Sequence, residues 1–287
     1  MAVSRTAQYV AMYRAFETDE RRRTPLFRDP YARGFLSPGM AFLVQAARAP
    51  IMRGLIERYT DRRAPGARTA VIARTAYIDD AVRSAVAAGV DQVVILGAGF
   101  DCRAHRMPEL RGAAVFEVDH ADTQAEKRAK LPDAAGVRYV AVDFLRDDPG
   151  AMLAMAGWDP RRRSVFVWEG VTAYLTESAV TSVLGWISTT AAGTCVVFTY
   201  LHGGVFDGSP QFEGSERVMA NVRRLGEPWT FGLKPEAVAA FVARCGLRLH
   251  EDLGADDYRR RYLTDVSRGY AFYRIAIAGV GAAVLPA

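Results

Sequence analysis

Short apolar runs, rich in β-branched residues, alternate with helical patterns from about residue 90 to the end of the chain. These runs predict strands at 93–96, 115–118, 137–142, 165–168, 195–200, 247–251 and 272–278. The first five are almost continuously apolar, which is typical of strands that helices cover on both faces. Strands that alternate with helices indicate parallel β-α-β units, so the pattern predicts an α/β fold.

Two of the connecting helices carry clear boundary signals. Thr176 is placed to cap a helix whose apolar residues recur at helical spacing, namely Val180, Val183, Leu184 and Ile187. A second helix is predicted to begin at Pro235 and to stop at Gly246, because proline favours the first helical position and glycine the position after the last.

Two segments fall outside this alternation. Residues 1–68 are arginine-rich and helical in pattern, with breaks at Pro25, Pro30, Pro38 and Pro50. Residues 201–233 contain several glycines and one helical pattern around 216–225. Long insertions in a compact domain usually cover a functional site. We therefore predict a helical lid over 1–68, followed by a sheet-bearing domain over 69–287 that carries a second lid at 201–233.

The charged residues argue against several kinds of partner. Lys and Arg total 37 against 32 Asp and Glu, which gives a formal net charge of +5. The densest arginine runs, at 21–23, 161–163 and 259–261, lack the interleaved aromatic residues that stack on nucleic-acid bases. The 3 cysteines and 4 histidines show no metal-ligand spacing. We expect neither a nucleic-acid partner nor a metal.

The hydropathy pattern does not predict a membrane segment. The longest apolar run, 275–287, is shorter than the ~20 residues that a transmembrane helix needs. The N-terminus has Ser4, Arg5 and Thr6 where a signal peptide would have an apolar core. We expect a cytoplasmic protein without a membrane partner, and the sequence does not indicate an oligomeric state.

The sharpest chemical motif is the Gly-x-Gly turn of Gly97, Ala98 and Gly99, which directly follows the strand predicted at 93–96. Glycine lets the backbone turn tightly there and approach a ligand closely. Asp119 lies 20 residues after Gly99, at the end of the next predicted strand. That spacing is typical of a carboxylate that binds a ribose diol, so the motif predicts a nucleoside-containing ligand.

Acidic residues follow four successive predicted strands: Asp101, Asp119, Asp143 and Glu169. The carboxyl ends of parallel strands line the ligand crevice, so we expect these side chains to lie close together. Four carboxylates favour a cation, and S-adenosylmethionine carries both a sulfonium and an ammonium group. A dinucleotide fits less well, because Asp101 would repel a pyrophosphate and Cys102 replaces the third glycine of the usual motif.

Five blocks, taken in order, resemble the leucine carboxyl methyltransferase family of class I S-adenosylmethionine-dependent methyltransferases, especially its bacterial branch. The blocks are RTAYIDD at 74–80, ILGAGFDCR at 95–103, FEVD at 116–119, YVAVDF at 139–144 and EGVTAYL at 169–175; residues 4–7 and 226–229 add two further landmarks. The resemblance implies a Rossmann-like fold with a mostly parallel seven-stranded sheet, helices on both faces, an N-terminal helical lid and a lid insertion after the fifth strand. It also implies that 69–287 is the S-adenosylmethionine-binding domain.

The resemblance assigns residues to the methionine portion of the cofactor. Arg74 would bind its carboxylate, and Glu169 would face its ammonium group. The backbone of Gly97, Ala98 and Gly99 would pass close to it.

The nucleoside portion would be bound at the ends of the next strands. By the same resemblance, Asp119 would bind the ribose, Asp143 would accept from the adenine amine, and the backbone of Phe144 would lie beside the adenine ring.

The expected methyl acceptor is a carboxylate of a small molecule or a peptide end. A carboxylate has a pKa of about 4 and is ionised at neutral pH, so alignment and exclusion of water would suffice without a base. Arg5 or Arg14 could orient the acceptor, and Tyr174 could contact it or pack under the Thr176 cap. A phenol acceptor, with a pKa of about 10, would need a base, for which His202 is the candidate.

Two other classes of function stay open at this point. An NAD-linked oxidoreductase on a similar sheet would change nicotinamide absorbance or fluorescence on binding, whereas a methyltransferase would bind S-adenosylhomocysteine. A non-catalytic S-adenosylmethionine-binding protein would be stabilised by the cofactor without forming a methylated product.

Overall fold

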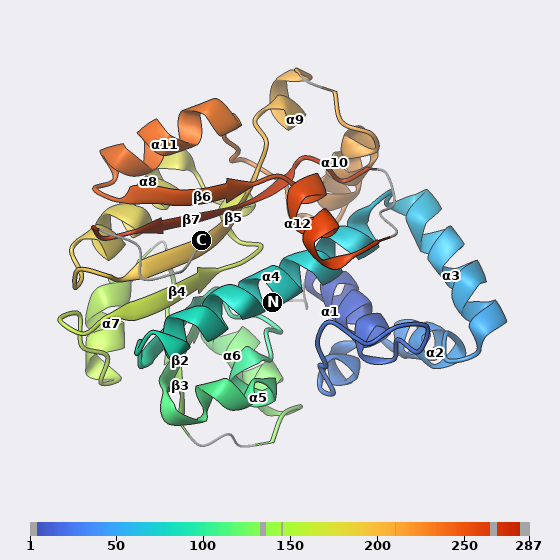
Figure 1. Cartoon of the computed structure of the whole chain (residues 1–287), viewed down its shortest axis with the longest axis horizontal. Coiled ribbons are helices and arrows are strands. Elements are labelled where there is room, and N and C mark those ends of the chain that lie inside the picture. The colour runs from blue at the N-terminus through green and yellow to red at the C-terminus, as the bar shows by residue number, and fades with distance from the viewer. Residues whose placement is uncertain (1–4, 133–135, 145, 210, 265–268, 282–287) are drawn as a thin grey trace.

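A computed structural model of the chain describes residues 5–132, 136–144, 146–209, 211–264 and 269–281. Its centre is one seven-stranded sheet (Figure 1). The strands are β1 (Gln92–Leu96), β2 (Ala114–Asp119), β3 (Val137–Ala141), β4 (Ser164–Trp168), β5 (Cys195–Leu201), β6 (Arg248–Leu253) and β7 (Tyr273–Gly279). All the predicted strands are confirmed, with boundaries that differ by one or two residues.

The strand order brings the ends of the first four strands to one edge of the sheet. The order is β3-β2-β1-β4-β5-β7-β6; β1 to β5 run parallel, and β7 runs antiparallel to both its neighbours. Asp119, the last residue of β2, lies in register with Ala141 at the end of β3. The predicted mostly parallel sheet is therefore confirmed, and the residues after β1, β2, β3 and β4 share one edge.

Strand β6 continues two residues beyond its predicted end. Asp252 and Leu253 still pair with β7, after a register shift earlier in the strand. The apolar pattern missed this extension because Asp252 is charged. Its carboxylate accepts hydrogen bonds from the Tyr200 hydroxyl and from Arg274, both at 2.7 Å.

Helices cover both faces of the sheet. On one face lie α4 (Ala67–Ala87) and α12 (Ala255–Tyr262), and on the other lie α7 (Pro149–Met155), α8 (Glu177–Ser188) and α11 (Pro235–Arg244). Within β1, Val93 and Ile95 pack toward α4 while Val94 and Leu96 pack toward α8 and α11. Burial on both sides explains why the strand is apolar throughout.

The connecting elements agree with the boundary signals in the sequence. The Thr176 hydroxyl accepts a hydrogen bond from the backbone N–H of Ala179 at 3.3 Å, so it caps α8 as predicted. Helix α11 begins at Pro235. The remaining connections are α5 (Arg103–Arg106), η2 (Pro108–Gly112), α6 (Ala121–Arg128) and η3 (Thr172–Tyr174).

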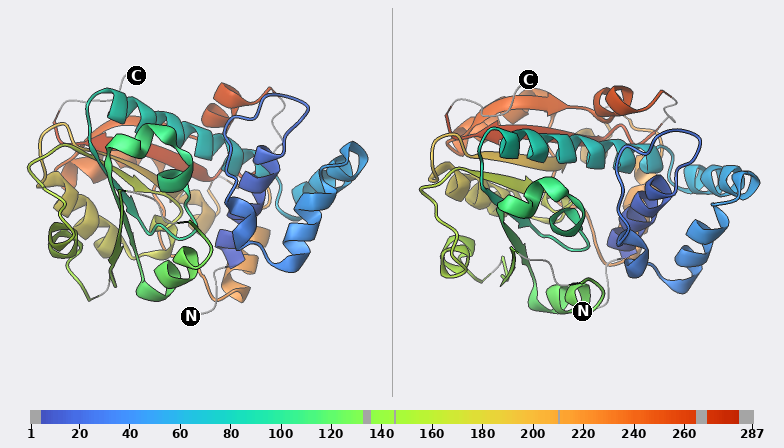
Figure 2. Two further views of the ribbon diagram at one scale, coloured as in Figure 1. Left: turned by 90° about the horizontal axis from the view of Figure 1, so that it is seen from below. Right: turned by 60° about the horizontal axis from the view of Figure 1, so that its bottom comes forward.

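The N-terminal segment forms a helical group beside the sheet, and α4 runs from it across the sheet face (Figures 1 and 2). The group contains α1 (Arg5–Thr18), η1 (Ala32–Phe35), α2 (Pro38–Ala46) and α3 (Pro50–Arg63). Phe16, Val44 and Ile56 pack together with Val71 near the start of α4. Pro38 and Pro50 begin α2 and α3, which explains two of the proline breaks in the sequence.

The insertion after β5 contains α9 (Gly204–Asp207) and α10 (Ser215–Arg224), the second close to the helix predicted around 216–225. Val205 and Val222 of the insertion pack against Trp229 and Phe272. The insertion therefore has a small apolar core of its own, continuous with the residues before β7. Pro210 lies outside the described residues.

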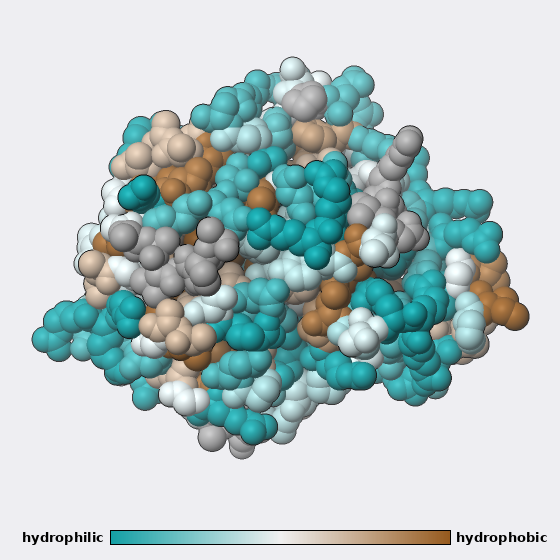
Figure 3. All heavy atoms as spheres, viewed as in Figure 1, coloured by the Kyte–Doolittle hydropathy of each residue, from teal (hydrophilic) through white to brown (hydrophobic). Residues whose placement is uncertain are grey.

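Exposed apolar side chains gather on the N-terminal group. Phe42, Ile51, Met52, Leu55 and Tyr59 are all exposed. Brown, hydrophobic atoms mark this region at the right-hand edge of Figure 3, over the junction of α2 and α3. None of the helices within the described ranges is both long and apolar enough to cross a bilayer.

Candidate functional site

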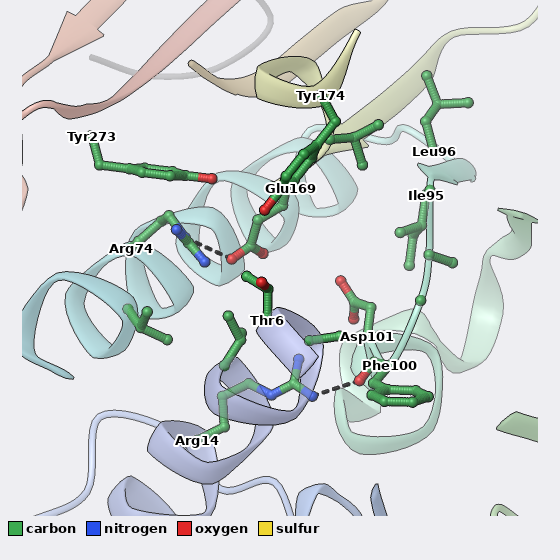
Figure 4. A pocket seen from close by; sticks show the side chains of 18 of the residues that line it. Thr6, Arg14, Arg74, Ile95, Leu96, Phe100, Asp101, Glu169, Tyr174 and Tyr273 are labelled. Atoms are coloured by element: carbon green, nitrogen blue, oxygen red, sulfur yellow. Dashed lines mark hydrogen bonds and ion pairs between the residues drawn. The ribbon is translucent and has the colours of Figure 1, made fainter. Parts of the chain in front are cut away.

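A cavity lies at the edge of the sheet where β1 and β4 end (Figure 4). Four parts of the chain line it: α1, α4, the loop after β1, and the loop after β4, together with rings from three later positions. The lining residues are Thr6, Ala7, Val10, Arg14, Val71, Arg74, residues 95–101, residues 169–171, Tyr174, Trp229, Tyr270 and Tyr273.

The Gly-x-Gly turn forms one wall of the cavity. Gly97 and Gly99 have φ of +64° and +41°, in the left-handed region that other residues rarely adopt. A Cβ on Gly97 would lie 2.4 Å from a methyl carbon of Val171, whereas one on Gly99 would meet nothing closer than 3.9 Å. Gly97 is therefore required both by its conformation and by the close approach of the loop after β4.

Asp119 holds the glycine turn from the neighbouring strand. Its carboxylate accepts hydrogen bonds from the backbone N–H of Gly99 at 2.6 Å and of His120 at 2.7 Å. A carboxylate can accept further hydrogen bonds besides these two. The structure thus places Asp119, which lies 20 residues after Gly99 in the sequence, directly behind the turn.

Arg74 and Glu169 form a direct ion pair in the cavity wall. Arg74 Nε lies 2.7 Å from Glu169 Oε1, and the Arg74 guanidinium stacks on the Tyr273 ring, 4.6 Å from its centroid (Figure 4). Arg74 is 3% exposed, so its buried positive charge needs the negative charge of Glu169 to compensate it. The pair presents one positive and one negative group to the same space.

Arg103 joins the acidic residues beneath the cavity. It is buried, and it donates to Asp79 at 2.8 Å, to Glu169 at 2.8 Å and to Asp101 by a short hydrogen bond. Arg106 donates two further hydrogen bonds to Asp79, both at 2.7 Å. Arginine thus balances the charge of these carboxylates.

Neighbouring basic side chains control the ionisation of Asp101 and Glu169, the two acidic residues that line the cavity. Burial alone would raise the pKa of Asp101, but Arg103, Lys127 and Arg14 hold it well below its usual range. Burial likewise opposes the effect of Arg103 and Arg74 on Glu169, whose net pKa is also lowered. Both side chains are therefore carboxylates at neutral pH and cannot serve as bases of ordinary strength.

Helix α1 closes the cavity through direct contacts with the glycine turn. Arg14 Nη2 donates to the backbone carbonyl of Phe100 at 2.5 Å (Figure 4). Arg14 Nε lies 3.1 Å from Asp29. Thr6 and Ala7 also line the cavity. Arg5, the other arginine considered for the acceptor, is exposed at the start of α1 and does not line it.

Tyr174 also reaches the cavity wall. Burial raises the pKa of Tyr174 to about 12, against hydrogen bonds with the side chains of Trp229 and Thr6 that lower it. The hydroxyl therefore stays protonated and is available as a hydrogen-bond donor at neutral pH.

Besides Arg5, four expected residues do not line the cavity: Asp119, which lies behind the glycine turn, and Asp143, Phe144 and His202. Asp143 and Phe144 follow β3; Asp143 is partly exposed, 3.6 Å from Arg146, and Phe144 packs on the edge of the core. His202 follows β5, and its Nδ1 accepts from the backbone N–H of Gly204 at 2.9 Å. The structure does not bring His202 to the cavity, because its ring packs against Phe212 of the insertion. Ser4 lies outside the described residues.

Several residues of the site were missed from the sequence. Arg103 and Asp79 lie within the matched blocks, but their pairing depends on contacts between residues 24 positions apart. Tyr270 and Tyr273 carried no signal beyond their aromatic character, and Trp229 appeared only as part of a landmark. The one signal that could have indicated Arg103 is its place in a matched block, two positions after Asp101.

The residues fit a zwitterionic nucleoside such as S-adenosylmethionine. The opposed charges of Arg74 and Glu169 match the carboxylate and ammonium of its methionine portion. The glycine turn lies beside them in the lining, and Gly97 packs so closely against Val171 that no side chain fits at this position. Asp119, behind the turn, is a hydrogen-bond acceptor suited to ribose hydroxyls.

Known proteins similar to this chain also point to S-adenosylmethionine as the ligand. The model of the leucine carboxyl methyltransferase family matches residues 7–188. A protein of Frankia alni is 38% identical over 210 residues, which cover 70% of each chain, and one of Streptomyces avermitilis is 40% identical over 208 residues, again covering 70% of each. Both bear the provisional name S-adenosyl-L-methionine-dependent methyltransferase.

Solved structures share the fold at lower identity. A crystal structure from Thermobifida fusca, provisionally named a methyltransferase, has a TM-score of 0.61 at 19% identity and covers 88% of this chain and 93% of its own. A DUF574 family protein from Streptomyces avermitilis has a TM-score of 0.58 at 16% identity, covering 86% and 92%. At these identities the likeness concerns the fold alone.

Proposed function

The chain belongs to the leucine carboxyl methyltransferase family and is an S-adenosylmethionine-dependent methyltransferase, and from this premise we propose that it methylates a carboxylate oxygen of a small molecule or a peptide end. The observation that carries the proposal is the make-up of the cavity wall. No histidine, lysine or cysteine from the described part of the chain lines it, and its two acidic residues are held ionised by arginine.

The methionine portion of the cofactor is assigned to one end of the cavity. S-adenosylmethionine, when bound, supplies a methyl group on a positively charged sulfur. Arg74 binds the carboxylate of this portion, Glu169 binds its ammonium, and the backbone of Gly97, Ala98 and Gly99 lies alongside. Asp101 adds negative charge near the sulfonium. The support for these roles is the position of all six residues in the cavity lining.

The nucleoside portion is assigned to the ends of β2 and β3. Asp119 binds the ribose hydroxyls, and Asp143 and the Phe144 backbone bind the adenine. The support is the strand register, which sets the end of β2 beside the end of β3 and so brings Asp143 to the same edge as Asp119.

A carboxylate acceptor suits a wall without a base. Its oxygen is already ionised above a pKa of about 4, so the chain needs only to orient it and keep water out. Tyr174, with its protonated hydroxyl, and Thr6 are the uncharged donors that would hold the acceptor oxygen. Helix α1 excludes water, because Arg14 ties it to the Phe100 carbonyl.

The test is transfer of a labelled methyl group. The pure chain is incubated with methyl-labelled S-adenosylmethionine and separate pools of carboxylic acids and phenols, and the product is exposed to mild alkali. We expect a base-labile ester from the carboxylic acids, formed at a rate that is nearly constant from about pH 6 to 8. A base-stable label from the phenols, at a rate that rises steadily with pH, would overturn the proposal.

A further inference from the structure

The cavity wall divides into a charged part and an aromatic part. The rings of Tyr174, Trp229, Tyr270 and Tyr273 form the aromatic part. They come from η3, from the segment before α11, and from the segment around the start of β7, on the side of the sheet away from β2 and β3. Among the described residues, these three segments place no charged side chain in the lining.

Tyr270 holds an unusual backbone conformation within this part. Its φ is +59°, and no other non-glycine residue in the described ranges has a positive φ. A bulky residue is strained there, and such strain persists where the surroundings enforce it, often at binding sites. Its ring lies 5.7 Å from that of Tyr273, at an interplanar angle of 17°, and 4.7 Å from that of Phe272.

The residue before Tyr270 is packed tightly against the N-terminal helical group. Gly269, the residue before it, has φ of +94°, and a Cβ there would lie 2.6 Å from the backbone oxygen of Pro65. Pro65 sits between α3 and α4, so this segment is pressed against the N-terminal helical group. The result is a fixed turn that brings the Tyr270 ring to the cavity wall.

Trp229 is fixed on another side of the cavity. Its neighbour Thr230 donates a backbone hydrogen bond to the carbonyl of Ala173 in η3 at 2.7 Å. The Trp229 ring packs 5.7 Å from Phe272, which also contacts Tyr270. The rings of Trp229 and Tyr270 therefore both pack against the buried ring of Phe272.

We propose that the methyl acceptor has a flat aromatic body, as in an aryl carboxylic acid, and that Tyr270 and Trp229 determine this specificity by packing against it. The inference rests on the proposed carboxylate methylation and narrows its substrate class. Aromatic rings gain favourable edge and face contacts with one another that a saturated ring of similar size lacks. A peptide end would instead bring amide groups that each need a hydrogen-bond partner, for which the side chains of this part of the wall offer only tyrosine hydroxyls and one indole N–H.

The experiment compares two acids that differ in flatness. 2-Naphthoic acid and its fully hydrogenated counterpart are titrated by calorimetry into the chain saturated with S-adenosylhomocysteine. We expect the flat acid to bind at least tenfold more tightly. Tyr270→Gly and Trp229→Ala should each weaken naphthoate binding about tenfold and leave the affinity for S-adenosylhomocysteine unchanged. Tyr59→Ala, which removes an exposed ring on α3, is the control and should change neither affinity.

A stability comparison keeps the test independent of folding defects. Tyr270→Gly should unfold at a higher temperature than Tyr270→Ala, because glycine tolerates the positive φ. Equal affinity for the two acids, or no measurable naphthoate binding, would overturn the proposal. So would a fall in S-adenosylhomocysteine affinity in Tyr270→Gly, since the ring would then act through Tyr273 and Arg74 on the cofactor.

Failure of the wider function has a different outcome. Calorimetry detects acid binding without methyl transfer. Ring-dependent naphthoate binding without any base-labile ester would therefore contradict carboxylate methylation and support the aromatic acceptor site. An ester formed equally well on flat and saturated acids would support carboxylate methylation and contradict the aromatic acceptor site.

Discussion

Arg74 Nε and Glu169 Oε1 lie 2.7 Å apart, so the residue assigned to the carboxylate of the cofactor and the residue assigned to its ammonium are bonded to each other. Each also has a second partner: the Arg74 guanidinium stacks on the ring of Tyr273, which lines the same cavity, and Glu169 accepts a hydrogen bond from Arg103. The two charges are thus fixed in place before a ligand enters. Preorganisation of this kind lowers the cost of ordering side chains on binding.

Removing one charge of this pair should weaken cofactor binding and stability together. Glu169→Gln keeps the shape of the side chain but leaves the buried Arg74 without its carboxylate. We expect the affinity for S-adenosylhomocysteine, measured by calorimetry, to fall by about 10- to 100-fold, the range for a hydrogen bond between charged groups. Urea unfolding should show a loss of about 3 kcal/mol.

The matched control is Glu177→Gln. Glu177 lies at the start of α8, exposed, with Arg244 at 3.7 Å as its partner. Both measurements should stay at their starting values there. An unchanged affinity in Glu169→Gln would mean that the ammonium of the cofactor binds elsewhere.

The sequence could predict this fold because its central strands are buried on both faces and are therefore apolar without interruption. It could predict the glycine turn and Asp119 because their spacing is local. Two partners of Arg103, Asp79 and Glu169, could not be found in this way, since they lie 24 and 66 positions from it along the chain. Nor does any residue type signal the left-handed backbone of Tyr270, which tertiary packing imposes.

The carboxylates after the strands show the same limit. The sequence placed Asp101, Asp119, Asp143 and Glu169 at one edge, and the sheet topology brings the ends of their strands together. It did not show that arginine neutralises two of them. The site therefore offers S-adenosylmethionine paired charges beside a carboxylate, rather than four free carboxylates.

The two glycines of the turn should differ in their tolerance of a side chain. Gly97→Ala introduces both a strained φ and a clash with Val171 at 2.4 Å, whereas Gly99→Ala introduces strain alone. Strain at one residue costs about 1–3 kcal/mol, so Gly99→Ala should lose that much in the free energy of unfolding. Gly97→Ala should lower the free energy of unfolding by more than Gly99→Ala does. Its affinity for S-adenosylhomocysteine should also fall further than that of Gly99→Ala. Equal losses in urea unfolding would contradict the close packing of the turn against the loop after β4.

The two arginines of α1, Arg14 and Arg5, should differ in their effects on stability and on cofactor release. Arg14→Ala removes the hydrogen bond to the Phe100 carbonyl and leaves Asp29 buried, with Arg106 at 4.0 Å as its remaining ion-pair partner. Breaking a buried ion pair costs about 3–5 kcal/mol, and α1 should also pack less firmly against the cavity. We expect lower stability and faster release of S-adenosylhomocysteine, measured by stopped-flow. Arg5→Ala, at the exposed start of the same helix, should alter neither.

A buried ion pair beneath the site should make stability depend on pH. Lys127 Nζ lies 2.6 Å from Glu117 Oε2, and the two side chains are 1% and 0% exposed. Burial raises the pKa of Glu117 to about 7, against the opposing effect of Lys127. The folded chain therefore binds more protons than the unfolded chain between about pH 4.5 and 7, so this group lowers stability as pH rises through that interval.

Replacing both members of the pair should remove this dependence. Between pH 5 and 8 the group costs the folded chain up to about 3 kcal/mol, since one pKa unit corresponds to about 1.4 kcal/mol. We expect the variant Glu117→Leu with Lys127→Met to be at least as stable as the original chain at pH 8, because apolar residues of similar volume often replace a buried ion pair without loss. Lys127→Met alone should lower the free energy of unfolding most at pH 8, where it leaves the Glu117 carboxylate buried without a partner. The loss should be smallest at pH 5, where protonation of Glu117 removes that charge. Urea unfolding at both pH values measures these differences, and a double variant that loses stability at pH 8 would show that the pair stabilises the fold.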